Sequence, residues 1–248
     1  MKKILVIGES CVDIFVYCHA ERLAPDVPVP VLRIVNEVES AGMASNVERN
    51  ITAIYQHCDM ITNPQWKGVK KTRYVHTTSN HTFIRVDTDH HIPRIEVHDM
   101  PLADYDLVVI SDYNKGFLTE EDIEAICNRH ETVFIDTKKV LGQWAAKAKF
   151  IKINNFEYER SKAHMPEVLE DKIICTKGDM GATFQGTIYP VAHKVEVKDT
   201  SGAGDSFFAA LVVRYAETSD IAESITFANL CASKVVEQKG ISVIERPA

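Results

Sequence analysis

Five short apolar runs constrain the fold of this chain more than any other feature. These runs are rich in valine, isoleucine and phenylalanine. They span Ile4–Ile7, Leu107–Ile110, Thr132–Ile135, Phe150–Ile153 and Lys172–Cys175. Continuous apolar runs of this length are typical of strands that are buried on both faces. Segments with helical periodicity lie between them, which indicates a parallel sheet covered by helices. We therefore expect an α/β fold with a mainly parallel central sheet.

Helices are expected where apolar spacing and capping residues agree. A helix that begins near Ala44 places Val47 and Ile51 on one face. Thr119 can cap a second helix, because three acidic residues follow it where the helix dipole favours negative charge. A third helix is expected from about residue 219 to residue 237.

Two segments depart from this α/β pattern. Residues 27–35 are β-branched and contain prolines, which suits an edge strand. Residues 70–88 alternate polar and apolar side chains, as in a sheet with one face in water. We expect these segments to form a small β-sheet lid. The predicted division is an α/β core of residues 1–13, 37–69 and 89–248, with a lid of residues 14–36 and 70–88.

Composition and charge exclude several classes of partner. No run approaches the roughly 20 apolar residues that a membrane span requires. The net charge is −7, with 28 basic and 35 acidic residues, so the chain lacks the basic surface typical of nucleic-acid-binding proteins. The six cysteines are scattered without a C-x-x-C pair, which argues against a disulfide framework or a structural zinc site. We expect a cytoplasmic protein that binds neither nucleic acid nor membranes.

The string Asp199-Thr200-Ser201-Gly202-Ala203-Gly204-Asp205-Ser206 is the most specific candidate site. It precedes an apolar helical run, so it lies where a helix begins. The small residues at 202–204 allow backbone N–H groups to approach a ligand closely, and the helix dipole adds to the attraction for an anion. Asp205 can accept a proton from a hydroxyl group that attacks the bound anion. The alternative is that Asp205 only caps the helix.

Two common nucleotide-binding motifs do not fit this string. No Gly-Lys-Ser/Thr follows at the spacing of a Walker A loop, and Phe207 stands where a dinucleotide fingerprint would have its third glycine. A P-loop enzyme and an NAD enzyme are therefore disfavoured.

The string resembles the C-terminal signature of the ribokinase/PfkB carbohydrate kinase family, Asp-Thr-x-Gly-Ala-Gly-Asp. The resemblance implies a ribokinase-like three-layer αβα sandwich with a small β-sheet lid. It also implies that Asp205 is the catalytic base and that Gly202, Ala203 and Gly204 form an anion hole. Asp199 and Thr200 belong to the same motif, on the nucleotide side.

Other family motifs follow in order along the chain. Thr176, Lys177, Gly178 and Gly181 lie in a segment that is similar to the Thr-Lys-Gly-x-x-Gly nucleotide-site turn. Residues 152–157 resemble Lys-Pro-Asn-x-x-Glu. In that segment Asn154 and Glu157 would help to organise Mg²⁺ and phosphates, Glu157 indirectly through water. The implied cofactors are ATP and Mg²⁺, with a monovalent cation such as K⁺ as a further candidate.

On the sugar side, Asp13 follows the first strand at the place of the family's sugar-binding aspartate. Gly42 and Asn46 resemble the Gly-Gly-x-x-x-Asn sugar motif with its first glycine replaced by Ala41. By resemblance, these three residues would hold hydroxyl groups of a small sugar substrate. Each of them also has an ordinary interpretation, as a turn, packing or surface residue.

Several segments resemble the heptose-phosphate kinase domain that works in ADP-heptose synthesis. They are residues 22–31, 71–73, 84–87 and 111–116. A substrate that already carries a phosphate needs cations at the sugar pocket, and Lys71, Arg73, Arg85 and Lys115 are the candidates. The alternative is that Arg73 and Arg85 are solvated lid residues.

The sequence also departs from the family pattern. Ile153 and Asn155 replace a proline and a common acidic residue, and the stretch 47–70 lacks the length for a complete strand–helix pair. We expect the sheet to lose or shorten an element there, which leaves the substrate open. A nucleoside or free-hexose kinase and a non-catalytic sugar- or nucleotide-binding protein remain alternatives. A homodimer through the lid is also expected if the outer face of the lid is apolar.

Overall fold

A computed structural model describes residues 1–88, 91–191, 195–240 and 242–246. Its main sheet has the strand order β12-β11-β10-β9-β8-β7-β1-β4, and it is parallel from β10 to β4. The strands are β1 (Ile4–Gly8), β4 (Cys58–Ile61), β7 (Leu107–Asp112), β8 (Val133–Thr137), β9 (Phe150–Asn154), β10 (Ile173–Thr176), β11 (Ala182–Phe184) and β12 (Thr187–Tyr189). All five apolar runs therefore form strands of this sheet, as predicted.

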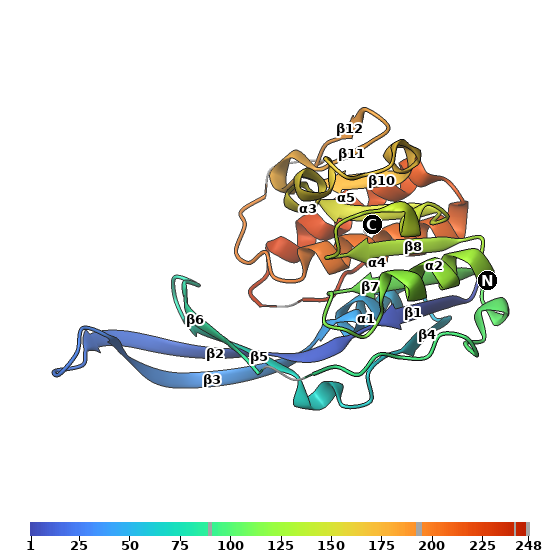
Figure 1. The fold of residues 1–248 in the computed structure, drawn as a ribbon. Helices are drawn as coiled ribbons and strands as arrows, with labels where there is room; N and C mark the ends of the chain where they lie inside the picture. Colours follow the sequence, from blue (N-terminus) through green and yellow to red (C-terminus); the bar gives the residue numbers. More distant parts are fainter. Residues whose placement is uncertain (89–90, 192–194, 241, 247–248) are drawn as a thin grey trace.

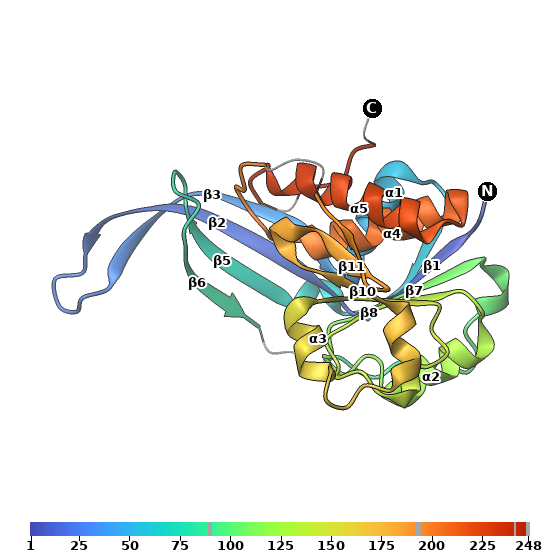
Figure 2. The same ribbon diagram turned by 90° about the horizontal axis from the view of Figure 1, so that it is seen from above.

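Helices cover both faces of the main sheet (Figures 1 and 2). One layer consists of α1 (Ala44–Ile54), α4 (Ala203–Thr218) and α5 (Ile221–Val236), and the other contains α2 (Glu120–Arg129) and α3 (Asn155–Ser161). Because side chains alternate along a strand, Ile4 and Val6 of β1 pack toward the first layer, and Leu5 and Ile7 pack into the core under α2. The predicted three-layer α/β arrangement is confirmed.

A second sheet of four strands, in the order β3-β2-β5-β6, lies beside the main sheet. Its strands are β2 (Ser10–Leu23), β3 (Pro30–Met43), β5 (Lys70–His76) and β6 (Thr82–Asp87). The β2–β3 hairpin projects far from the core (Figure 1). This sheet is larger than the predicted lid, because β2 and β3 continue through residues 10–13 and 37–43.

The stretch between α1 and β5 keeps its strand and loses its helix. β4 pairs in parallel with β1, with Cys58 opposite Ile4. The chain then reaches β5 through a single 3-10 turn at Trp66–Gly68, with no α-helix among residues 62–69, all of which the structure describes. The sheet was expected to lose or shorten an element here: it keeps a four-residue edge strand, and the helix of the strand–helix pair is the element that is absent from these described residues.

No helix in the described part of the chain combines the length and apolar character that crossing a membrane requires.

Candidate active site

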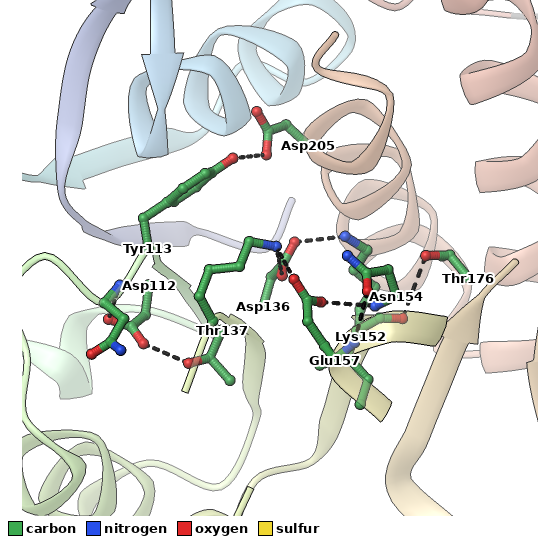
Figure 3. Close-up of polar contacts among 12 residues, drawn as sticks. Asp112, Tyr113, Asp136, Thr137, Lys152, Asn154, Glu157, Thr176 and Asp205 are labelled. Atoms are coloured by element: carbon green, nitrogen blue, oxygen red, sulfur yellow. Dashed lines mark hydrogen bonds and ion pairs between the residues drawn. The ribbon is translucent and has the colours of Figure 1, made fainter. Parts of the chain in front are cut away.

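The carboxyl ends of neighbouring parallel strands bring the candidate residues together. Tyr113 follows β7, Asp136 lies near the end of β8, Asn154 ends β9 and Thr176 ends β10. In open α/β sheets, ligands bind along this edge, where loops and helix N-termini converge. Figure 3 shows these side chains in a row, with Asp205 of α4 above Tyr113.

Asp205 lies in the first turn of α4, with its side chain buried. The helix begins after Gly202, whose φ of 78° lies in the left-handed region that glycine adopts without strain. Asn46 of α1 donates a hydrogen bond to Asp205 Oδ2 at 2.9 Å. Tyr113 donates its phenolic proton to Oδ1 at 2.6 Å. Two long-range hydrogen bonds thus fix the orientation of the carboxylate.

The environment of Asp205 affects its acidity in opposite directions. Burial raises the pKa of Asp205 above its ordinary value, because the charged form loses solvation. The hydrogen bonds from Asn46 and Tyr113 oppose this increase in pKa, because they stabilise the carboxylate. A buried carboxylate of raised pKa next to a helix N-terminus is suited to accept a proton.

A pocket of about 610 Å³ lies beside Asp205. Its lining includes nine predicted site residues: Asn154, Thr176, Gly178, Gly181, Thr200, Gly202, Ala203, Gly204 and Asp205 itself. The apolar side chains of Val195, Val197 and Val236 form another part of its wall. The pocket therefore combines a helix N-terminus with an apolar surface, a combination suited to a phosphate attached to a flat ring.

Two lysines and two acids form a polar network (Figure 3), and three of them, Asp136, Lys138 and Lys152, line this pocket. Lys152 donates to Asp136 Oδ2 at 2.7 Å, and both side chains are buried. Lys138 donates to Glu157 Oε1 at 2.5 Å. Burial works to raise the pKa of Asp136, but the charges of Lys152 and Lys138 lower it below its ordinary value. Asp136 stays ionised, and its buried Oδ1 accepts no hydrogen bond in the described structure.

Asn154 and Glu157 also cap α3. The Asn154 side chain accepts from the Glu157 N–H at 2.9 Å, and Glu157 Oε2 accepts from the Asn154 N–H at 2.8 Å. This reciprocal capping box fixes Glu157 beside Lys138. The Asn-x-x-Glu spacing thus has a local structural role, and it also holds a carboxylate at the edge of the pocket.

Asp13 and Arg73 lie on the other side of Asp205, on the second sheet. They form a largely buried ion pair between β2 and β5. A side chain at Gly42 would collide with Asp13, because a Cβ there would lie 2.2 Å from Asp13 Oδ2. Asn46 connects this side to Asp205 through the hydrogen bond described above. The four predicted sugar-side residues Asp13, Gly42, Asn46 and Arg73 therefore gather near the carboxylate.

Four other predicted residues lie apart from the lining of the 610 Å³ pocket. Arg85 pairs with Asp87 on its own strand, and its side chain is 54% exposed. Lys115 has an exposed side chain, and its backbone N–H donates to Glu9 Oε1 at 2.7 Å. Lys177 precedes a 3-10 turn. Asp199 accepts from the N–H groups of Ser201 and Gly240, and so holds the loop before α4. The roles of these residues stay predictions.

The sequence reasoning missed Tyr113, Asp136 and Lys138 as site residues, and it gave Lys152 no role of its own. Asp136 and Lys138 follow an apolar run that was predicted as a buried strand, and that position is a signal that could have identified them. Tyr113 lies in the segment 111–116 that resembles the heptose-phosphate kinase domain, but that resemblance gave the tyrosine no role, and its partner Asp205 is 92 positions away in the sequence.

Comparison with known proteins gives a consistent result. The pfkB family of carbohydrate kinases matches residues 74–246. The bifunctional protein HldE of Caulobacter vibrioides is 28% identical over 300 residues, which cover 98% of this chain and 62% of the relative. The chain thus spans under two thirds of that relative's length. These matches confirm the resemblance inferred from the motifs.

Solved structures confirm the predicted ribokinase-like fold. Ribokinase of Thermotoga maritima superposes with a TM-score of 0.75 at 15% identity, covering 97% of this chain and 95% of the other. Phosphofructokinase-2 of Escherichia coli in complex with potassium superposes with a TM-score of 0.70 at 14% identity, covering 99% and 96%. At these identities the likeness establishes the fold.

Proposed function

Because the chain belongs to the pfkB family of carbohydrate kinases, we propose that it transfers the γ-phosphate of ATP to a hydroxyl group of a phosphorylated sugar. The candidate acceptor is a heptose 7-phosphate such as D-glycero-D-manno-heptose 7-phosphate, suggested by the similarity to HldE. The chain covers only part of that bifunctional relative, so the proposal concerns the kinase reaction alone.

The position of the Asp205 carboxylate carries this proposal. It accepts a hydrogen bond from Asn46, one of the residues proposed to hold the acceptor, and it lines the pocket that opens onto the N-terminus of α4. A hydroxyl group placed there would contact the base, and a phosphoryl group beside Gly202–Gly204 would contact backbone N–H groups. In phosphoryl transfer, positioning and charge stabilisation supply most of the acceleration.

The residues around the pocket fit ATP with Mg²⁺. Among the described residues, none donates a hydrogen bond to the buried Asp136 Oδ1, and Lys138 Nζ lies 3.8 Å from it, so this oxygen can accept from water bound to a metal ion. Glu157 is proposed to act in the same indirect way. Mg²⁺ would neutralise phosphate charge as it develops. Lys138 and Lys152 place two further positive charges at the pocket.

In the proposed reaction, the oxygen of the acceptor hydroxyl attacks the γ-phosphorus of ATP. Asp205 accepts the proton of that hydroxyl. The amides at 202–204 stabilise the negative charge on the transferred group. The second sheet would exclude water, which otherwise competes as the acceptor. Potassium is proposed as a stimulating ion, supported by its presence in the related phosphofructokinase-2 complex.

The phosphate of the acceptor is proposed to bind cations of β5. Lys71 is the cross-strand partner of Asp13, and Arg73 already pairs with Asp13. Both side chains therefore lie on the face that carries Asp13. A planar guanidinium can bind a carboxylate and a phosphate at the same time through different N–H groups.

The test is ADP release from ATP and Mg²⁺ with phosphosugars, free sugars and nucleosides. We expect turnover with a heptose 7-phosphate and at least tenfold weaker activity with unphosphorylated acceptors. Turnover with a free hexose or a nucleoside alone would contradict the phosphosugar assignment. ATP binding without turnover on any acceptor would favour a non-catalytic binding protein.

We also propose a homodimer through the second sheet, in the cytoplasm, where ATP is available. Ile34, Ile84 and Val86 of this sheet are 60%, 53% and 47% exposed. Such a group of exposed β-branched residues is typical of an interface. Light scattering should give a dimer mass for the native chain and a lower mass for Ile84→Glu. Ile188→Glu, at an exposed site on β12, should leave the mass unchanged.

A further inference from the structure

We propose that Tyr113 is a positioning residue that keeps Asp205 ionised and directs its carboxylate toward the acceptor hydroxyl. The inference rests on the proposed function, because it requires Asp205 to be the base. Neither the family motifs nor the resemblance assigned a role to this tyrosine.

The contact between the two residues is direct (Figure 3). Tyr113 donates to Asp205 Oδ1 at 2.6 Å, and Asn46 donates to Oδ2 at 2.9 Å. One donor on each oxygen prevents the carboxylate from rotating. Each oxygen can accept more than one hydrogen bond, so the acceptor hydroxyl can still reach a free lone pair.

Three hydrogen bonds hold the loop that carries Tyr113. Asn114 has a φ of 56°, in the left-handed region that asparagine adopts more readily than most other non-glycine residues. Glu9 accepts from the Lys115 N–H at 2.7 Å, Asp112 accepts from the Asn114 N–H at 3.1 Å, and Asn114 accepts from Lys139 Nζ at 3.0 Å. Because Glu9 and Asp112 are buried, these hydrogen bonds fix the loop beside Asp205.

The surroundings keep the phenol protonated. Burial, followed by the charge of Asp205, raises the pKa of Tyr113 well above its usual value. The hydroxyl therefore acts as a hydrogen-bond donor and does not compete as a second base. Lys71 Nζ lies 5.0 Å and Lys138 Nζ 5.5 Å from the ring centroid, so the ring also contacts cations from both sides of the site.

Other charged groups near Asp205 do not replace this hydrogen bond. Asp136 from β8 opposes ionisation of Asp205, and Lys152 from β9 favours it. Lys138 also interacts with Asp205 through its charge, and the charge of Asp205 helps to raise the pKa of the Cys11 thiol of β2, which stays neutral. Among the described residues, only Asn46 and Tyr113 donate hydrogen bonds to the carboxylate.

During transfer, the bond between the acceptor oxygen and the γ-phosphorus forms while the bond from that phosphorus to the bridging oxygen of ATP breaks. The acceptor proton passes to Asp205, and ADP leaves. Tyr113 keeps its own proton throughout. Its contribution is to stabilise the carboxylate before the proton arrives.

The test is the pH dependence of kcat/KM for Tyr113→Phe with the acceptor that supports turnover. The acidic limb of this profile reports the ionisation of the free enzyme's base. Loss of a hydrogen bond to a charged group should move the limb upward by about one to two pH units. Activity should fall most at low pH and recover toward the native value at high pH. An unmoved limb, with turnover unchanged or reduced equally at all pH values, would overturn the proposal.

Tyr105→Phe is the matched control, because Tyr105 donates to Asp59 Oδ2 at 3.0 Å outside the lining of the pocket. It should leave the limb in place. If Tyr113→Phe does not fold, 3-fluorotyrosine at position 113 tests the same contact. Its more acidic phenol should strengthen the hydrogen bond and move the limb downward, and an upward shift would contradict the proposal. Asp205→Asn separates the two claims: full turnover in that variant rejects the proposed base, whatever Tyr113→Phe does.

Discussion

Asn46 of α1 and Asp205 of α4 are 159 positions apart in the sequence, and a hydrogen bond of 2.9 Å joins their side chains. This bond connects the helix that follows the second sheet to the helix that carries the proposed base. Both residues are buried, so water cannot replace the lost donor fully if Asn46 is removed.

Asn46→Ala should therefore reduce kcat/KM by about 10- to 100-fold, because hydrogen bonds to charged groups contribute about 1.5–3 kcal/mol. Steady-state kinetics at neutral pH will measure this loss. Asn63→Ala provides the contrast, since Asn63 is also buried but lies outside the lining of the 610 Å³ pocket, and its Oδ1 accepts from the Ser10 N–H at 2.7 Å. Its main effect should be on the free energy of unfolding. Equal turnover of Asn46→Ala and the native chain would contradict the assigned contact.

The native chain should lose activity on acidification at a pH above the ordinary aspartate range. Burial raises the pKa of Asp205, so its carboxylate accepts a proton at a higher pH than the usual value of about 3.9. Turnover requires the ionised form, and kcat/KM should fall as the pH drops through this raised pKa. An acidic limb at or below about 3.9 would argue against Asp205 as the group that titrates.

Lys152→Met should destabilise the fold by about 3–5 kcal/mol, because it leaves the buried Asp136 carboxylate without its nearest cation. Denaturant unfolding will measure the change. Lys149→Met removes an exposed lysine at the start of the same strand region, and its effect should stay within about 0.5 kcal/mol.

The pH dependence of this stabilisation has a definite sign. Burial acts to raise the pKa of Asp136 in the folded state, but the charges of Lys152 and Lys138 outweigh burial and lower this pKa. The stabilisation is therefore present above the unfolded pKa of about 3.9 and is lost as the pH falls through the lower folded value. A difference between Lys152→Met and the native chain that grows on acidification would contradict the assignment.

Arg73→Ala should raise KM for a phosphosugar about tenfold or more, with little change in KM for ATP. The reason is that Asp13 loses its buried partner and the acceptor phosphate loses a cation. Arg33→Ala is a suitable control, because Arg33 pairs with Glu21 in an exposed position of the same sheet. A larger rise in KM for ATP than in KM for the acceptor would contradict the assignment of Arg73 to the acceptor phosphate.

The features that the sequence predicted correctly are those encoded locally. Apolar runs fixed the main strands, and the residues from 199 to 206 located the start of α4. The edge strand β4 was missed because Cys58–Ile61 is only four residues long and contains Asp59. Tyr113 was missed because its role depends on a hydrogen bond between distant residues, and such contacts leave no periodic pattern.

The sequence predicted the presence of a second β-sheet but underestimated the length of its strands β2 and β3. The alternating residues 70–88 indicated β5 and β6, whereas β2 continues directly from the end of β1 through Asp13. The first seven residues of β2 are buried and most of them are apolar, so in the sequence they resemble a strand of the core rather than the start of a new sheet. A change of sheet within an extended segment needs three-dimensional information.

The most direct test of the central claim is turnover of Asp205→Asn, measured as ADP release with Mg²⁺ and the acceptor that the native chain phosphorylates, alongside ATP binding by calorimetry. The amide preserves the size of the side chain and removes its ability to accept a proton at neutral pH. We predict a loss of about 100-fold or more in kcat, with ATP affinity within a few-fold of the native value. Turnover equal to that of the native chain would contradict Asp205 as the base.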